Sequence, residues 1–159
     1  MIFKTKFNFN WKQASLLIFL LIFPNILSIY HTTIFGVRVH LFQYLIFLAA
    51  LIYGPYAGAI SGALGSIYSA IALHNPYIII GNILLGFFFG YFVKLKWNIL
   101  FAVITAYFIQ LPWLWLTDVY LIHMPVSAVA GIIVALFVSD VILSVLAKYT
   151  FKHIQNFFR

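Results

Sequence analysis

The chain has 159 residues, of which 65% are hydrophobic, 20% aromatic and only 7% charged, with a net charge of +7 and no cysteine. A soluble domain is nearer half apolar and a quarter charged, so the excess apolar surface must face lipid. The lack of cysteine excludes disulfides, thiolate metal sites and cysteine nucleophiles, and cations spread among loops and chain ends do not form a nucleic-acid-binding face.

Six apolar runs, separated by short polar or Pro- and Gly-containing breaks, are predicted to form transmembrane helices. In chain order they cover residues 13–30, 39–53, 56–73, 77–93, 97–116 and 126–147, and a polar loop over residues 117–125 joins the last two. Several runs are shorter than the roughly 20 apolar residues that cross hydrocarbon unaided. Short helices interrupted by Pro or Gly are tolerated where they pack on protein or line a cavity.

The lysine and arginine residues predict the orientation of this bundle. Positive charge favours the cytoplasmic side of a membrane. If both chain ends lie in the cytoplasm, all nine Lys and Arg residues except Arg38 fall on that side. We therefore expect an all-α, polytopic protein of the cell membrane, with six transmembrane helices and both termini cytoplasmic. It forms a single domain over residues 1–159, with basic cytoplasmic segments at residues 1–12 and 148–159.

The opposite, outer side is predicted to collect polar and aromatic side chains. Four of the five histidines fall there, whereas the inner side holds lysines and little else. An interfacial belt accounts for Trp and Tyr at headgroup level but not for histidines, an arginine and amides on one side alone. A polar and aromatic cluster at one end of an apolar bundle is typical of a small-molecule site. The predicted substrate-binding residues are Tyr30, His31, Arg38, His40, His74, Asn75, Asn82, Gln110, Trp113, Asp118 and Tyr120.

Small residues recur at every fourth position of the third run. This spacing places them on one helix face, and close backbone approach drives helix packing in lipid. Two interpretations are open, because the face either holds the bundle together or docks another membrane subunit. The residues are Gly54, Gly58, Gly62, Ser66 and Ala70, with shorter stripes at Gly86 and Gly90 and at Gly131, Ala135 and Ser139.

Residues 35–93 resemble the substrate-binding S components of energy-coupling factor (ECF) transporters. The resemblance lies in the stretches FGVRVHLFQYLIFLAALIYGPYAGAISGALGSIYSAI and NPYIIIGNILLGFFFGYF. In this pattern a helix ends in a Gly-Pro turn, a Gly/Ala-rich helix follows, and a G-N-x-x-x-G helix comes next. The matching residues here are Gly54-Pro55, then Gly58, Gly62 and Gly65, then Gly81-Asn82 and Gly86.

The resemblance implies a six-helix membrane fold and a subunit that captures a vitamin, a related micronutrient or a metal ion from outside. Such a subunit associates with a membrane T component and two cytoplasmic ATPases, and its site is built from the loop after the first helix and the outer ends of later helices. Two family features differ here. Ala14 is followed four positions on by Ile18 instead of a second Ala, and residue 2 is Ile2 instead of the His that marks the metal-ion branch.

Single residues leave alternatives open. Arg38 either pairs with a carboxylate, phosphate or carbonyl group of a substrate or extends to outer headgroups. Asp140 lies inside the sixth run, where a polar contact between helices or with a partner subunit is favoured over a proton relay, because relays need chains of ionisable groups. Asn82 is predicted to bond across helices or else to line the cavity.

The outer histidines and aromatic residues favour an organic ligand over a metal ion. No two histidines have the helical ligand spacing of three or four, and Asp118 is the only outer carboxylate, although imidazoles do suit transition metals. Aromatic faces attract flat or cationic ligands. The aromatic residues expected to stack on a ring are Tyr30, Tyr77, Trp113, Trp115 and Tyr120.

We therefore predict a substrate-capture subunit of an ECF-type uptake system. Its partners would be a small organic substrate, membrane lipid, a T component and two ATPases, with no nucleic acid and no cofactor. The sequence contains no combination of nucleophile, base and acid that would suggest an enzyme. Two alternatives are a structural or assembly membrane protein without a ligand and a metal-ion-binding S component. A third, an intramembrane enzyme using His and Asp118, would need paired acids and bases that so few carboxylates do not supply.

Overall fold

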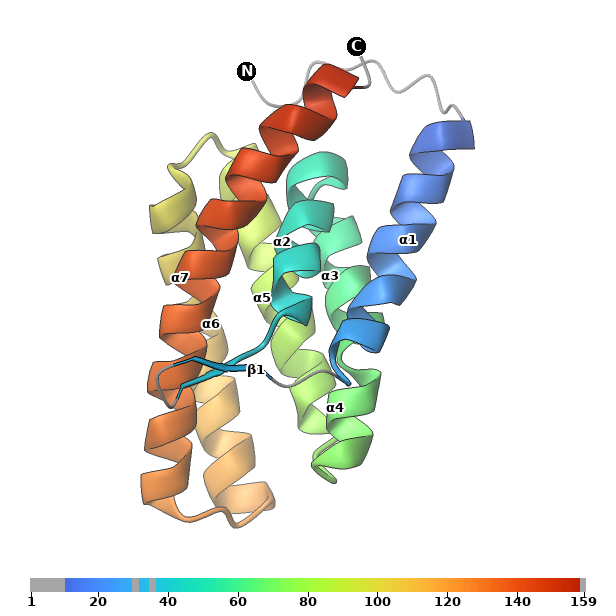
Figure 1. Cartoon of the computed structure of the whole chain (residues 1–159). Coiled ribbons are helices and arrows are strands. Elements are labelled where there is room, and N and C mark those ends of the chain that lie inside the picture. The colour runs from blue at the N-terminus through green and yellow to red at the C-terminus, as the bar shows by residue number, and fades with distance from the viewer. Residues whose placement is uncertain (1–10, 30–31, 35–36, 158–159) are drawn as a thin grey trace.

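The computed structural model describes residues 11–29, 32–34 and 37–157, which form a helical bundle with one small hairpin (Figure 1). The helical fold class predicted from the sequence is confirmed, and each apolar run corresponds to one helix or one pair of consecutive helices. The helices are α1 (Trp11–Leu27), α2 (Phe42–Tyr53), α3 (Pro55–Gly65), α4 (Ile67–Ala72), α5 (Tyr77–Lys94), α6 (Ile99–Trp115), the π-helical segment η1 (Leu116–Leu121) and α7 (Val126–Phe157).

Three helical segments of the described residues are long and apolar enough to cross a membrane: Tyr77–Lys94, Ile99–Leu121 and Val126–Ile154. Large apolar side chains remain exposed along them, such as Phe108 on α6 and Val134 and Ile142 on α7. Such a surface is unfavourable in water and compatible with lipid. The composition and these helices together indicate a membrane protein.

The bundle has two chemically different ends. The start of α1, the turn between α5 and α6, and the end of α7 lie together at one end in Figure 1. We call this the basic end, because it carries Lys12, Lys94, Lys96 and Lys152. The hairpin and α4 lie toward the other half of the bundle, and the α6–α7 connection lies at its far end.

The hydrophobic core is concentrated toward the basic end. Phe47 of α2 contacts Phe89 of α5 with ring centroids 4.8 Å apart, and both are fully buried. Ala147 and Phe151 from the last third of α7 belong to the same cluster. The opposite half of the bundle is less completely filled, which leaves space there for a cavity.

Glycines bring α3 and α5 into backbone contact. A Cβ added to Gly58 would lie 2.5 Å from the carbonyl oxygen of Gly86, and one added to Gly62 would overlap the backbone of Asn82. A Cβ on Gly90 would lie 2.7 Å from Cα of Pro55. Of the two interpretations of the small-residue stripe, the first holds for these positions, because the stripe is used inside the bundle.

The chain between the first two helices differs from the prediction. The first run was expected to stay helical to residue 30, but α1 ends at Leu27, and a hairpin follows in which β1 (Thr32–Ile34) pairs antiparallel with β2 (Val37–Val39). The second run consequently starts its helix at Phe42 instead of residue 39. Every described strand residue except Arg38 is Thr, Ile or Val, which are β-branched and favour strands.

Two further boundaries also differ. The third run is divided at Ser66, whose hydroxyl donates to the Gly62 carbonyl at 2.6 Å, and α4 begins with the Tyr68 N–H donating to the Asn25 side chain of α1 at 2.9 Å. The predicted loop over residues 117–125 is largely helical, because α6 continues into η1. There the Thr117 hydroxyl bonds the Trp113 carbonyl at 2.9 Å and so keeps the turn closed.

Candidate functional site

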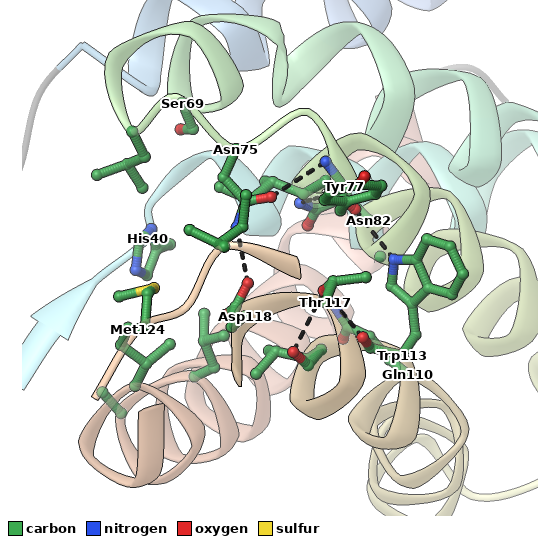
Figure 2. A pocket seen from close by; sticks show the side chains of 18 of the residues that line it. His40, Ser69, Asn75, Tyr77, Asn82, Gln110, Trp113, Thr117, Asp118 and Met124 are labelled. Atoms are coloured by element: carbon green, nitrogen blue, oxygen red, sulfur yellow. Dashed lines mark hydrogen bonds between the residues drawn. The ribbon is translucent and has the colours of Figure 1, made fainter. Parts of the chain in front are cut away.

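A cavity of about 340 Å³ lies between the helices in the half of the bundle away from the basic end. Figure 2 shows side chains that line it. Its wall is formed by the start of α2, the turn between α4 and α5, the first turns of α5, the end of α6 with η1, and the early part of α7. Most of the lining is apolar, as in many small-molecule sites. The polar and aromatic residues that line it include His40, Gln43, Ser69, Asn75, Tyr77, Asn82, Gln110, Trp113, Thr117 and Asp118.

Asn75 positions the carboxylate of Asp118. Its side-chain Nδ2 donates to Asp118 Oδ1 at 2.7 Å, and its Oδ1 accepts the backbone N–H of Tyr77 at 3.1 Å. Both residues are buried, at 3% and 7% exposure. Since the amide of Asn75 is held at both atoms, it fixes the carboxylate at the cavity wall (Figure 2).

Trp113 is held equally firmly. Its indole Nε1 donates to the backbone carbonyl of Tyr77 at 3.1 Å. The two aromatic rings meet edge to face, with centroids 6.3 Å apart. Because the indole nitrogen is already bonded, Trp113 adds aromatic surface to the cavity wall and not a free donor.

Three amide oxygens around the cavity have no hydrogen-bond partner within the described part of the chain. They are Gln43 Oε1, Asn82 Oδ1 and Gln110 Oε1, and the three residues are between 1% and 4% exposed. Leaving a buried acceptor unpaired costs about 1–3 kcal/mol, so such atoms in a native protein need an explanation. A ligand that forms hydrogen bonds with these amides would supply one.

Local sequence explains how these amides reach the cavity. Gly81 leaves room for Gln110, because a Cβ at position 81 would lie 3.2 Å from Gln110 Nε2. Asn82 was predicted to bond across helices, but its Nδ2 donates to Ile78 of its own helix at 3.0 Å. The alternative expectation, that Asn82 lines the cavity, is the one the structure supports.

Six of the eleven residues predicted to bind substrate line the cavity: His40, Asn75, Asn82, Gln110, Trp113 and Asp118. Two others lie elsewhere. Tyr120 is 63% exposed, because η1 turns Thr117 and Asp118 inward and therefore turns Tyr120 outward. His74 is exposed in the turn after α4, where the chain reverses so that Asn75 is the residue directed inward.

Three predicted residues are not placed by the structure. Tyr30 and His31 lie outside the described residues, and for Arg38 only the backbone is described, in β2 opposite Thr33. Their part in a site stays a prediction. Of the aromatic residues expected to stack on a ring, Tyr77 and Trp113 line the cavity, whereas Trp115 and Tyr120 do not.

Gln43, Ser69 and Thr117 line the cavity although they are not among the eleven predicted binding residues. Helix phase could have indicated Thr117, because Gln110, Leu114 and Thr117 follow each other on one face of a helix. This signal was hidden by the expectation of a loop from residue 117. Ser69 lies among small residues that sequence alone assigns to packing.

The described residues contain no group of three or more His, Asp or Glu side chains that could hold a metal ion. His40 and Asp118 bring one imidazole and one carboxylate to the cavity wall. The other polar groups are amides, hydroxyls and aromatic nitrogens, which bind by hydrogen bonding. The described lining therefore suits reversible recognition of an organic molecule.

Asp140 lies outside the cavity lining and is fully buried in α7. It was predicted to make a polar contact between helices or with a partner subunit. Neither carboxylate oxygen has a hydrogen-bond partner within the described ranges, so the first contact is not made, and the second stays a prediction. Tyr107 lies close enough to interact electrostatically with it, yet the Tyr107 hydroxyl donates to the Ile133 carbonyl at 2.6 Å.

No family model, curated protein or solved structure matches this chain. The likeness to S components is therefore carried by the motifs of residues 35–93 alone.

Proposed function

We propose that this chain is the substrate-capture subunit of an ECF-type uptake transporter, and that it binds a small organic micronutrient in the cavity. The observation that carries the proposal is the set of buried, unpaired amide oxygens of Gln43, Asn82 and Gln110 around a space of about 340 Å³. This volume falls within the roughly 300–1,000 Å³ of small-molecule sites. A protein that only packs against other membrane proteins has no need for unpaired acceptors around a cavity.

The proposed topology has six crossings, formed by α1, α2, α3 with α4, α5, α6 with η1, and α7. With 17 and 12 residues, α1 and α2 are about 26 and 18 Å long, less than the roughly 30 Å of hydrocarbon. The hairpin and the flanking turns complete their crossing of the membrane. The positive-inside rule then assigns the basic end and both termini to the cytoplasm, and the cavity to the outer half of the cell membrane.

This arrangement is consistent with capture from outside. The lysines that orient the bundle are separated from the cavity by the hydrophobic core, so a substrate would enter from the side opposite to the ATPases. A T component and two ATPases would supply the energy for transport, because the chain contains no G-x-x-x-x-G-K-[ST] motif of its own.

Native mass spectrometry of gently purified protein tests the proposal. We expect a small organic molecule to co-purify and to be retained more than tenfold less tightly after Trp113→Ala, because this change removes the fixed aromatic wall. Phe101→Ala serves as the control, since Phe101 is 67% exposed on the same helix and does not line the cavity. Protein of normal stability without any bound molecule would instead favour the structural or assembly role.

A further inference from the structure

The chemistry of the cavity restricts the class of ligand beyond the proposed capture function. Among the described residues that line it there is one carboxylate, Asp118, and no Lys or Arg. Lys94 at the end of α5 and Lys96 in the turn before α6 lie at the basic end, on the far side of the core. The described lining therefore offers an anionic ligand no Lys or Arg, only the imidazole of His40, and places the carboxyl group of Asp118 beside it.

The hydrogen-bonding groups of the cavity wall restrict the ligand further. Several side-chain donors at the cavity wall are already bonded to protein acceptors: the amide nitrogens of Asn75 and Asn82, the indole nitrogen of Trp113 and the hydroxyl of Thr117. In contrast, the oxygens of Gln43, Asn82 and Gln110 are buried without a donor. The amides of Gln43 and Gln110 make no hydrogen bond within the described residues and so offer a ligand both a donor and an acceptor, whereas Asn82 offers an acceptor only.

We infer that the cavity takes a molecule that carries a protonated nitrogen next to an aromatic ring, and that no anionic group of it enters the cavity. Asp118, held by Asn75, pairs with the protonated nitrogen. The amides of Gln43 and Gln110 bond the remaining polar groups of the molecule, and the ring lies against Trp113, whose face also attracts cations. This inference rests on the proposed function, since it names the substrate class of the same cavity.

Arg38 provides the competing expectation, because a substrate carboxylate or phosphate would pair with it. The two expectations differ in the sign of charge that the site prefers. Three probes that share an indole ring separate them: tryptamine is a cation, indole-3-ethanol is neutral and indole-3-propionate is an anion. Their dissociation constants are measured by equilibrium dialysis against the purified full-length protein in detergent.

We expect tryptamine to bind at least tenfold more tightly than indole-3-propionate, with indole-3-ethanol in between. Asp118→Asn should reduce the preference to less than threefold, because the amide keeps the shape and loses the charge. Asp140→Asn is the matched control. Asp140 is the only other acidic residue in the sequence, and it does not line the cavity. Its replacement should therefore leave the preference for tryptamine unchanged.

Three outcomes overturn the inference. The first is a preference for indole-3-propionate that Arg38→Ala abolishes, which transfers recognition to the arginine while substrate capture stands. The second is an unchanged preference in Asp118→Asn. The third is no detectable binding of any probe at millimolar concentration. Native mass spectrometry of the same preparation then decides the proposed function separately, since a co-purified anionic molecule defeats only the inference, whereas protein without any molecule defeats both.

Discussion

At the scale of single residues, the cavity shows a clear division between side chains that are satisfied and side chains that are not. Asn75 uses both polar atoms of its amide within the protein, whereas Gln43, Asn82 and Gln110 each keep one oxygen unpaired. A buried amide of the first kind stabilises the fold and positions its neighbour. One of the second kind lowers stability in the absence of a ligand and contributes affinity when a donor arrives.

Replacing Asn75 should affect stability and binding together. In Asn75→Ala the Asp118 carboxylate loses its donor, and we expect a loss of about 1.5–3 kcal/mol in the free energy of unfolding, the range for hydrogen bonds to charged groups. Retention of the co-purified ligand should fall at the same time. Thermal unfolding in detergent and native mass spectrometry measure the two effects.

Asn98→Ala is the control for this change. Asn98 caps α6 by accepting the Leu100 N–H at 3.0 Å, and it lies at the basic end. Its loss should cost about 1 kcal/mol of stability without changing ligand retention. Equal loss of ligand in both variants would show that binding merely follows stability.

Removing an unpaired oxygen should have the opposite effect on the empty protein. In Gln110→Met a flexible apolar side chain of similar length replaces the amide, and position 110 no longer holds a buried acceptor without a donor. We expect the ligand-free protein to be as stable as the parent or more stable, and ligand retention to fall at least fivefold. A less stable variant with full retention would contradict the role assigned to this oxygen.

At the scale of elements, two features shape the site. The glycines of α3 let its backbone approach α5, which brings the first turns of α5 with Gly81 and Asn82 beside the end of α6. The π-helical turn of η1 then directs Thr117 and Asp118 to the cavity and Tyr120 away from it. π-helical turns are rare and occur frequently at functional sites, because the extra residue changes which side chains face inward.

Paired glycine substitutions test the α3–α5 contact. In Gly62→Ala the new methyl group meets the backbone of Asn82, which cannot move aside as a flexible side chain would, and we expect a loss of about 1–3 kcal/mol. Gly131→Ala on α7 is the matched control. No atom lies within 4 Å of its added Cβ, so it should be neutral or stabilising by up to about 1 kcal/mol. Similar thermal stability of the two variants would show that the contact is looser than described.

At the scale of the whole molecule, the division between the basic end and the cavity half is the central feature. Well-packed aromatic and aliphatic side chains fill the half with the lysines, and the amides, the carboxylate and the cavity occupy the other half. In the proposed topology, the cavity opens to the outer compartment and the positively charged surface lies in the cytoplasm.

The absence of native cysteine allows this orientation to be tested directly. Lys94→Cys at the end of α5 and Ser127→Cys in the first turn of α7 both place a thiol at an exposed position, at opposite ends of the bundle. With a membrane-impermeant maleimide on intact cells, we expect Ser127→Cys to be labelled and Lys94→Cys to be protected until the cells are opened. The reverse pattern would invert the proposed topology and place the cavity on the cytoplasmic side.

Local patterns were enough to predict the helical class, the membrane environment and the approximate course of six apolar segments, because apolar runs, their breaks and the positions of lysines are local signals. The sequence also identified six candidate residues that line the cavity: His40, Asn75, Asn82, Gln110, Trp113 and Asp118. The packing of the helices shows that these six residues line one cavity, while His74 and Tyr120 face outward. It also shows that Gly58 and Gly62 form the α3–α5 contact and that three amide oxygens remain unpaired. The physical reason is that side-chain direction depends on the phase of each helix against its neighbours, and hydrogen-bond satisfaction depends on atoms far apart in the chain, neither of which a local pattern contains.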